Sequence, residues 1–129
     1  MLLGSKEFIK KARRVRKRLG GGWRQAGYLA AAGIYALDNH VERLRDDHAR
    51  AKVIGETMAK LPEVEEILPV DTNIVILRLN EKLLSSDYVQ QLNEKGIRAT
   101  TFGKHLVRFV THLDFTDDHL EAFQKKILQ

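Results

Sequence analysis

A run of three glycines beside basic residues is the feature of this 129-residue sequence with the clearest potential for chemistry. Gly20, Gly21 and Gly22 have no side chains, so their backbone N–H groups could face a ligand closely. The helix expected from about Arg24 would add the positive end of its dipole, and Lys17 and Arg24 would add full charges. The segment therefore predicts a site for a phosphate or a carboxylate. A flexible turn between two helices, with incidental basic neighbours, is the alternative interpretation.

Arg108 is the second residue that could bind an anion. It lies in Leu106–Val110, where its neighbours are apolar and strand-like. A guanidinium on the face of a sheet needs a carboxylate or phosphate partner, because an unpaired charge is costly to bury. We therefore expect an anion at Arg108. An arginine on the solvent face of an edge strand is the alternative.

The other polar and aromatic residues carry no recognised catalytic pattern. None of the five histidines has a metal-ligand spacing such as HExxH, so no metal site is predicted. His112 and Asp114 could perform acid–base chemistry, although a turn that contains both is the more common arrangement. No lysine lies in an apolar pattern suited to Schiff-base chemistry. The positions of Trp23, Tyr28 and Tyr35 favour helix packing, in the core or at an interface, over base stacking.

Composition narrows the class of protein. Apolar residues make up 43% and charged residues 30%, the net charge is +5 and there is no cysteine. These values are typical of a globular protein in a reducing compartment, and we expect the cytoplasm. The cations between Lys10 and Arg18 are typical of a solvated helix face, and a nucleic-acid-binding module using residues 10–24 is the alternative function. The apolar run Ala26–Leu37 is too short to span a bilayer, so no membrane partner is expected.

The elements that must position these residues differ between the two halves of the sequence. Helical periodicity follows the N-cap residue Ser5 as far as Leu19, and it returns from about Arg24 to Leu61, with a bend expected at Asp38–Asn39. The second half predicts strands, two helices and a capping box at Asp87 and Gln90. These elements are strands over Val64–Val70, Asn73–Leu79, Ile97–Phe102 and Leu106–Thr111, a helix over Asp87–Lys95, and a last helix capped by Thr116.

This order predicts an α+β fold. Long N-terminal helices precede a small, mainly antiparallel sheet that helices cover. The apolar Ile74–Leu77 is expected at the centre of the sheet, and Gly103-Lys104 is expected to close a hairpin.

Four segments together resemble the threonine aldolases, which belong to the aspartate aminotransferase-like superfamily and depend on pyridoxal phosphate (PLP). The segments are Gly4–Lys6, Lys17–Gly27, Leu29–Gly33 and Val107–His112. The similarity runs from about Gly4 to the end of the sequence, and the glycine-rich string that continues into the alanines is its most specific part. The resemblance implies the C-terminal portion of such an enzyme, with the small domain of fold-type I PLP enzymes.

The resemblance also implies an activity and roles for particular residues. The family cleaves threonine or allo-threonine to glycine and acetaldehyde, in amino acid metabolism. Arg108 matches the arginine that binds the α-carboxylate of the amino-acid substrate. Lys17, Arg24, Gly21 and Gly22 match the cofactor site, to which a neighbouring subunit contributes. The family implies a homotetramer built as a dimer of dimers, and no nucleic-acid partner.

The same resemblance implies a division of the chain and a missing group. Residues 1–52 would be linking and oligomer-forming helices that belong with a large domain, and residues 53–129 would be the small domain. The family's Schiff-base lysine precedes the segment that begins at Gly4, and no lysine of this sequence takes its role. We therefore expect the isolated chain to be inactive and to bind no PLP by itself. We also expect Trp23 and the helix over Ala26–Leu37 to be exposed and to favour self-association.

Overall fold

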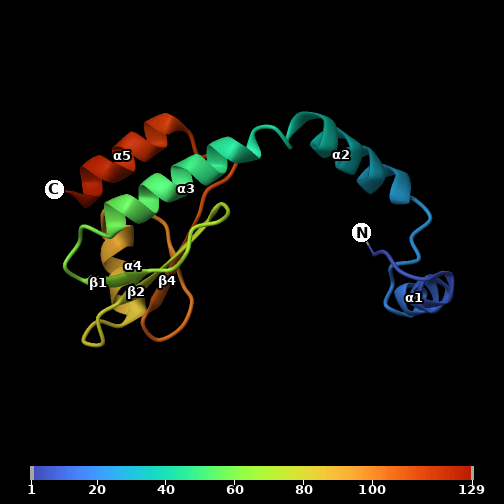
Figure 1. The fold of residues 1–129 in the computed structure, drawn as a ribbon, viewed down its shortest axis with the longest axis horizontal. Coiled ribbons are helices and arrows are strands. Elements are labelled where there is room, and N and C mark those ends of the chain that lie inside the picture. The colour runs from blue at the N-terminus through green and yellow to red at the C-terminus, as the bar shows by residue number, and fades with distance from the viewer. Residues whose placement is uncertain (1, 129) are drawn as a thin grey trace. The chain divides into compact units, whose positions relative to one another are not determined.

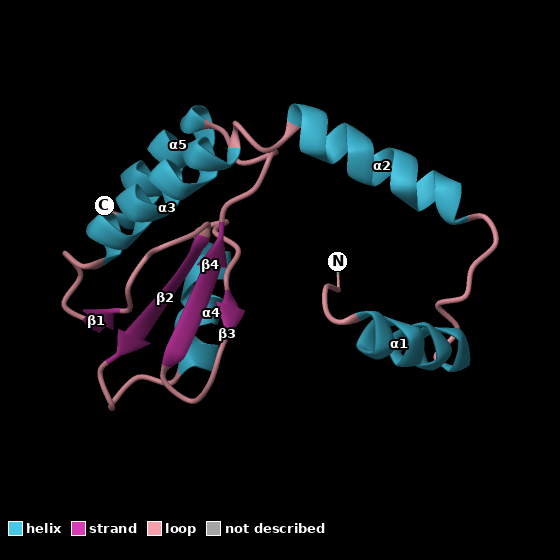
Figure 2. Cartoon of the chain, turned by 45° about the vertical axis from the view of Figure 1, so that its right-hand side comes forward, coloured by secondary structure: helices cyan, strands magenta, loops and turns pink. Residues whose placement is uncertain are grey.

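The computed structural model describes residues 2–128, and the chain divides after Val41 into two compact units that are considered separately (Figure 1). The first unit is helical, and the second combines helices with a sheet (Figure 2). The elements are α1 (Lys6–Arg18), α2 (Ala26–Asn39), α3 (Leu44–Met58), β1 (Val64–Ile67), β2 (Ile74–Leu79), α4 (Ser85–Glu94), β3 (Thr100–Thr101), β4 (Leu106–Val110) and α5 (Asp117–Ile127).

The helices of the first unit have solvated surfaces. The N-cap predicted for α1 is confirmed, because the Ser5 hydroxyl accepts a hydrogen bond from the Phe8 N–H at 3.2 Å. No residue of α1 or α2 is buried. Neither helix therefore has a hydrophobic core within its own unit.

The single long helical stretch expected from Arg24 to Leu61 is wrong, because α2 ends at Asn39 and α3 begins only at Leu44. The bend expected near Asn39 is confirmed. The side-chain amide of Asn39 donates to the carbonyl of Tyr35 at 2.9 Å, a local bond that competes with continuation of the helix.

β2 and β4 form the centre of the sheet in the second unit. The strand order is β1-β2-β4-β3, and every neighbouring pair is antiparallel. The central position predicted for Ile74–Leu77 is confirmed. The predicted hairpin of β3 and β4 is also confirmed, and its turn contains Gly103 at φ 140°, a conformation that favours glycine. The predicted α+β fold is therefore correct.

Two predicted strands are shorter than expected. β1 ends at Ile67, close to Pro69, which has no N–H to donate to a neighbouring strand. The N–H of Ile97 donates to the carbonyl of Leu92 at 2.8 Å and so closes the end of α4 instead of entering the sheet. β3 is consequently reduced to Thr100–Thr101.

The helices of the second unit pack on the face that β2 and β4 form with alternate residues. Val75, Leu77 and Val107 are completely buried there. The opposite face, which we call the open sheet face, carries the intervening side chains of the two strands, among them Arg108. The remaining buried apolar residues are Ala51, Ile54, Met58, Leu79, Tyr88, Leu92, Ile97, Phe109, Phe123 and Ile127.

The start of α4 differs from the prediction, whereas α5 agrees with it. α4 begins at Ser85, whose hydroxyl donates to the carbonyl of Gly103 at 2.6 Å. Asp87 then lies inside the first turn, so the capping box expected for Asp87 and Gln90 does not form. Thr116 caps α5 as predicted, since its hydroxyl accepts from the N–H of His119.

The second unit begins at Glu42, before the boundary expected between residues 52 and 53. That boundary falls inside α3, whose buried residues extend from Asp47 to Met58. A helix that packs on the sheet and on α5 of one unit belongs to that unit. The association of residues 1–52 with a larger domain stays a prediction.

Candidate functional site

The glycine turn first serves to end α1. Gly20 has a φ of 81°, and its N–H donates to the carbonyl of Lys17 at 3.3 Å. The N–H of Gly21 donates to the carbonyl of Arg16 at 2.8 Å. These two bonds form a Schellman motif, which satisfies carbonyl groups that a helix end leaves free. The N–H groups of Gly20 and Gly21 are therefore engaged within the chain, contrary to the expectation that they face a ligand.

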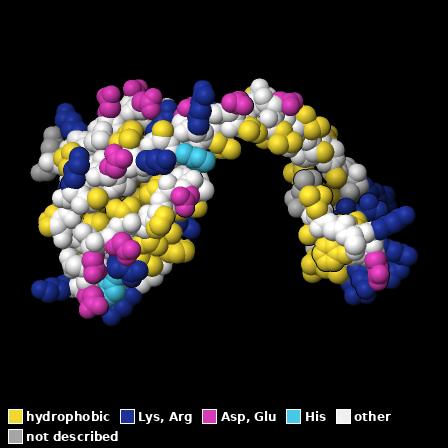
Figure 3. All heavy atoms as spheres, viewed as in Figure 1, with side chains coloured by type: hydrophobic (Ala, Val, Ile, Leu, Met, Phe, Trp, Pro, Cys, Tyr) yellow, Lys and Arg dark blue, Asp and Glu magenta, His cyan; other side chains and the backbone are white. Residues whose placement is uncertain are grey.

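Lys17 places its charge at the turn by folding against Gly22. A Cβ added at Gly22 would lie 3.2 Å from the Lys17 ammonium nitrogen and closer still to its Cδ. Glycine at this position therefore lets the lysine fold against the backbone. Arg24 is exposed, and within residues 2–128 neither Lys17 nor Arg24 has a recorded ion pair. Lysine and arginine side chains gather around α1 in Figure 3.

The helix dipole lies slightly later than expected. α2 begins at Ala26, two residues after Arg24, and no side chain caps it at Gln25. The uncapped N–H groups of this first turn retain the capacity to face an anion. The segment thus keeps the charges and the dipole of the predicted anion site but not the backbone cradle of Gly20 and Gly21.

Arg108 occupies the middle of the open sheet face. It stands opposite Ile76 of β2 on one side and Thr100 of β3 on the other. β4 is thus an inner strand, and the alternative of an edge-strand arginine is wrong. The guanidinium carbon lies 5.5 Å from the centre of the Phe102 ring. This is within the range of a cation–π contact.

The Nε of Arg108 lacks an acceptor. Among the described residues it is the one buried side-chain nitrogen or oxygen atom without a hydrogen-bond partner. A buried N–H donor without a partner is costly, and an arginine offers five donors in a planar fork that suits a carboxylate. The geometry therefore favours an anion at Arg108.

His112 and Asp114 form a turn, which was the more common of the two arrangements considered. The N–H of Asp114 donates to Nδ1 of His112 at 3.2 Å. His119 plays a similar local part, because its Nδ1 accepts from the N–H of Thr116 at 3.2 Å. Within residues 2–128 no three carboxylate or imidazole groups are close enough to hold a metal ion, and no helix of this range has the length and apolar character needed to cross a membrane.

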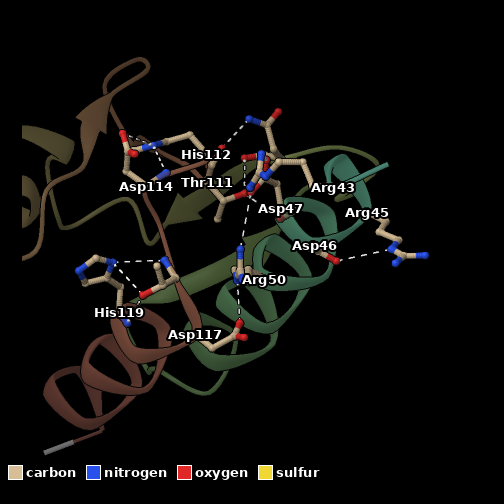
Figure 4. A network of polar contacts seen from close by, with 12 residues as sticks. Arg43, Arg45, Asp46, Asp47, Arg50, Thr111, His112, Asp114, Asp117 and His119 are labelled. Atoms are coloured by element: carbon tan, nitrogen blue, oxygen red, sulfur yellow. Dashed lines mark hydrogen bonds and ion pairs between the residues drawn. The ribbon is translucent and has the colours of Figure 1, made fainter. Parts of the chain in front are cut away.

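A polar network links α3 to α5 and to the end of β4 (Figure 4). The carboxylate of Asp47, which is 3% exposed, accepts two bonds from Arg43 at 2.9 and 2.7 Å. Arg50 bonds Asp117 at 2.7 Å and lies 3.9 Å from Asp47. The hydroxyl of Thr111 donates to the carbonyl of Asp47 at 2.7 Å. The network fixes the end of the strand that carries Arg108.

The sequence contains a signal for this network that our prediction did not use. The residues Arg43, Asp47 and Arg50 are spaced so that their side chains meet along one helix face. The hydrogen bond to Asp47 raises the pKa of Arg43, and the hydrogen bond from Arg50 lowers the pKa of Asp117. The link to Thr111 depends on tertiary contact and has no local signal.

The aromatic residues of the first unit are exposed. Trp23 is 60%, Tyr28 83% and Tyr35 61% exposed. The core alternative for these residues is therefore wrong within their own unit, and an interface role stays a prediction. The expected exposure of the apolar residues of α2 is confirmed, with Leu37 at 70%.

Residues 1–82 match the sequence pattern of the family described as beta-eliminating lyase. This chain belongs to that family. The predicted resemblance to threonine aldolases is confirmed, because threonine aldolases are among the relatives that are more than 30% identical to this chain. The chain is 39% identical over 122 residues to the low specificity L-threonine aldolase of Escherichia coli K12. The aligned region covers 93% of this chain and 34% of that protein. It is 35% identical over 124 residues to the probable low-specificity L-threonine aldolase 2 of Arabidopsis thaliana, covering 94% and 35%.

Two solved structures share the fold of this chain. A cystine C-S lyase, solved with cysteine persulfide, superimposes with a TM-score of 0.59 at 20% identity, covering 79% of this chain and 28% of the lyase. An ornithine aminotransferase of Toxoplasma gondii superimposes with a TM-score of 0.58 at 17% identity, covering 78% of this chain and 24% of the aminotransferase. These values confirm the expected likeness to fold-type I PLP enzymes at the level of the fold. The chain spans about a third of the length of the threonine aldolases that it matches.

Proposed function

We propose that this chain is the C-terminal part of a PLP-dependent threonine aldolase and that Arg108 binds the α-carboxylate of the amino-acid substrate. The observation that carries the proposal is the buried, unpartnered Nε of Arg108 on the open sheet face. A substrate carboxylate would supply the missing acceptor and match the fork of the guanidinium. The names of the relatives support threonine as a substrate, and we propose allo-threonine beside it.

Arg108 would orient the substrate through its fixed surroundings. The ring of Phe102 lies against the guanidinium, and β4 is held in register by two neighbouring strands. A positioned side chain holds the substrate at low entropic cost, because its rotamer is already selected. The product glycine would leave from the same carboxylate contact.

The cationic corner of Lys17, Gly21, Gly22 and Arg24 would hold the phosphate of PLP in a neighbouring subunit. Its residues fit a phosphate by charge, by the Lys17 ammonium that folds against Gly22 and by the uncapped start of α2. When bound, PLP acts as the electron sink for cleavage of the substrate. The exposed apolar residues of α2 support an assembly through this helix, and we propose a cytoplasmic homotetramer.

The isolated chain is proposed to be inactive, because no lysine here matches the family's Schiff-base lysine. The chain should be mixed with PLP and reduced with borohydride, and its intact mass should then be measured by mass spectrometry. We expect no stoichiometric pyridoxyl adduct. A single adduct on one lysine, formed in full yield, would contradict the proposal.

Arg108 can be tested in an assembled enzyme. The upstream two thirds of the Escherichia coli relative, joined to this chain, should restore cleavage of threonine to acetaldehyde. Arg108→Ala should then raise the KM by at least about a hundredfold, because it removes a charge-assisted bidentate contact. Arg78→Ala is the matched control, since Arg78 is exposed on a neighbouring strand and pairs with Glu66 at 3.0 Å. An Arg108→Ala enzyme that binds PLP and keeps the parental KM would refute the role.

A further inference from the structure

A hollow of about 540 Å³ opens in the second unit beside α5 and the end of β4. Its volume lies within the range of small-molecule sites. Its floor is apolar, and the rings of Phe109 and Phe123 meet there edge to face with centroids 5.9 Å apart. Ile54, Ile97 and Phe115 complete this floor. A hydrophobic body in the hollow would cover the apolar surface that the floor still exposes.

The rim of the hollow is cationic. Arg98 is exposed, and within residues 2–128 it has no recorded hydrogen bond or ion pair. Lys126 uses one N–H to bond the carbonyl of Lys95 at 2.8 Å, so two donors of its ammonium remain. Against these two charges the rim carries a single carboxylate, that of Asp114.

Two histidines also line the rim. His112 and His119 both line the hollow, and Figure 4 shows His112 on the chain after β4 and His119 on α5. Nδ1 of each ring accepts a backbone N–H, from Asp114 and from Thr116 respectively. In the neutral ring the proton must then lie on Nε2, which becomes a donor. Apart from Asp114, the polar side chains at the rim thus offer donors, whereas the floor offers apolar contact.

We propose that this hollow binds a small carboxylate with an aromatic or branched aliphatic body. The body would cover the phenylalanines of the floor, and the carboxylate would accept bonds from Arg98 and Lys126 at the rim. Arg108 does not line the hollow, so the inference does not depend on the function proposed above. An amine would meet cations at the rim, and a neutral amide would gain only the apolar contact.

The test is an NMR titration of the 129-residue chain, labelled with ¹⁵N, using phenylacetate, phenylacetamide and phenethylamine as probes. We expect phenylacetate to shift the amides of Ile97, Phe109 and Phe123 in a saturable manner. Phenylacetamide should bind about tenfold more weakly, since it lacks the charge, and phenethylamine should bind more weakly still. Equal affinities for the three probes, or shifts confined to α2, would overturn the proposal.

Three variants separate the charge from the apolar floor. Arg98→Ala should weaken phenylacetate about fivefold and leave phenylacetamide unchanged, because only the anion uses the guanidinium. Arg45→Ala is the control, since Arg45 is 80% exposed and pairs with Asp46 outside the hollow. Ala122→Leu lies on the surface of α5 and should narrow the hollow, weakening both probes while the thermal midpoint stays unchanged. Full binding by Ala122→Leu would overturn the assignment.

Discussion

The two units of this chain differ in what holds them together. The second unit buries residues from three helices and from the centre of a sheet. The first unit buries none of its helical residues and carries the strongly basic α1. A helix in water gains most of its stability from packing rather than from its own hydrogen bonds. The second unit therefore has a core of its own, whereas the helices of the first gain no buried packing within their unit.

The largest effect should follow a change in the core of the second unit. Leu77 is completely buried, whereas Leu37 of α2 is 70% exposed. Leu77→Ala should lower the free energy of unfolding by about 3 kcal/mol, because it removes apolar contact and leaves a cavity. Leu37→Ala should change it by less than about 0.5 kcal/mol. Urea denaturation measures both, and equal effects would remove the proposed difference between the units.

The next effect concerns the polar network at the start of α3. Asp47→Ala leaves Arg43 and Arg50 without their shared carboxylate, and it should cost about 2 kcal/mol in urea denaturation. Asp46→Ala is the matched control, because Asp46 is half exposed and its contact with Arg45 is 3.6 Å long. A control that destabilises as much as Asp47→Ala would show that helix charge, not the network, is responsible.

A smaller effect should appear in the pH dependence of the second unit. Arg50 lowers the pKa of Asp117, so folding favours the ionised carboxylate. The stabilisation is present above the ordinary aspartate pKa of about 3.9 and is lost as the pH falls through the lower folded-state value. Asp117→Asn should therefore melt below the parent at neutral pH and should approach it in strong acid. A difference in melting temperature that persists below that range would contradict this assignment.

The smallest effect is expected at the glycine turn of the first unit. Gly20 has a φ of 81°, which an alanine adopts only with strain. Gly20→Ala should fray the last turn of α1 and lower helicity by circular dichroism, while the urea midpoint of the second unit stays unchanged. Gly27→Ala is the control, because a Cβ at that helical position meets nothing within 4 Å. If Gly20→Ala shifted the urea midpoint of the second unit, the stabilities of the two units would be coupled, contrary to this prediction.

Local signals were sufficient for much of the fold. Ser5 and Thr116 were predicted as N-caps because short polar side chains satisfy the first N–H groups of a helix. Asp87 misled the prediction, because the start of α4 depends on the contact of Ser85 with Gly103, which is distant in the sequence. The helical pattern also continued across residues 40–43, so the prediction contained a bend where the structure separates α2 from α3.

The sequence by itself determined the family, the order of the elements and the presence of a cationic turn and of Arg108. These properties depend on residue type and short-range spacing, which the chain carries before it folds. Only the tertiary structure decided that Arg108 lies on an inner strand with an unpartnered Nε, and that the carbonyl of Asp47 accepts a bond from the Thr111 hydroxyl. Each of these depends on which distant groups become neighbours, because a buried polar atom is satisfied or orphaned by packing alone.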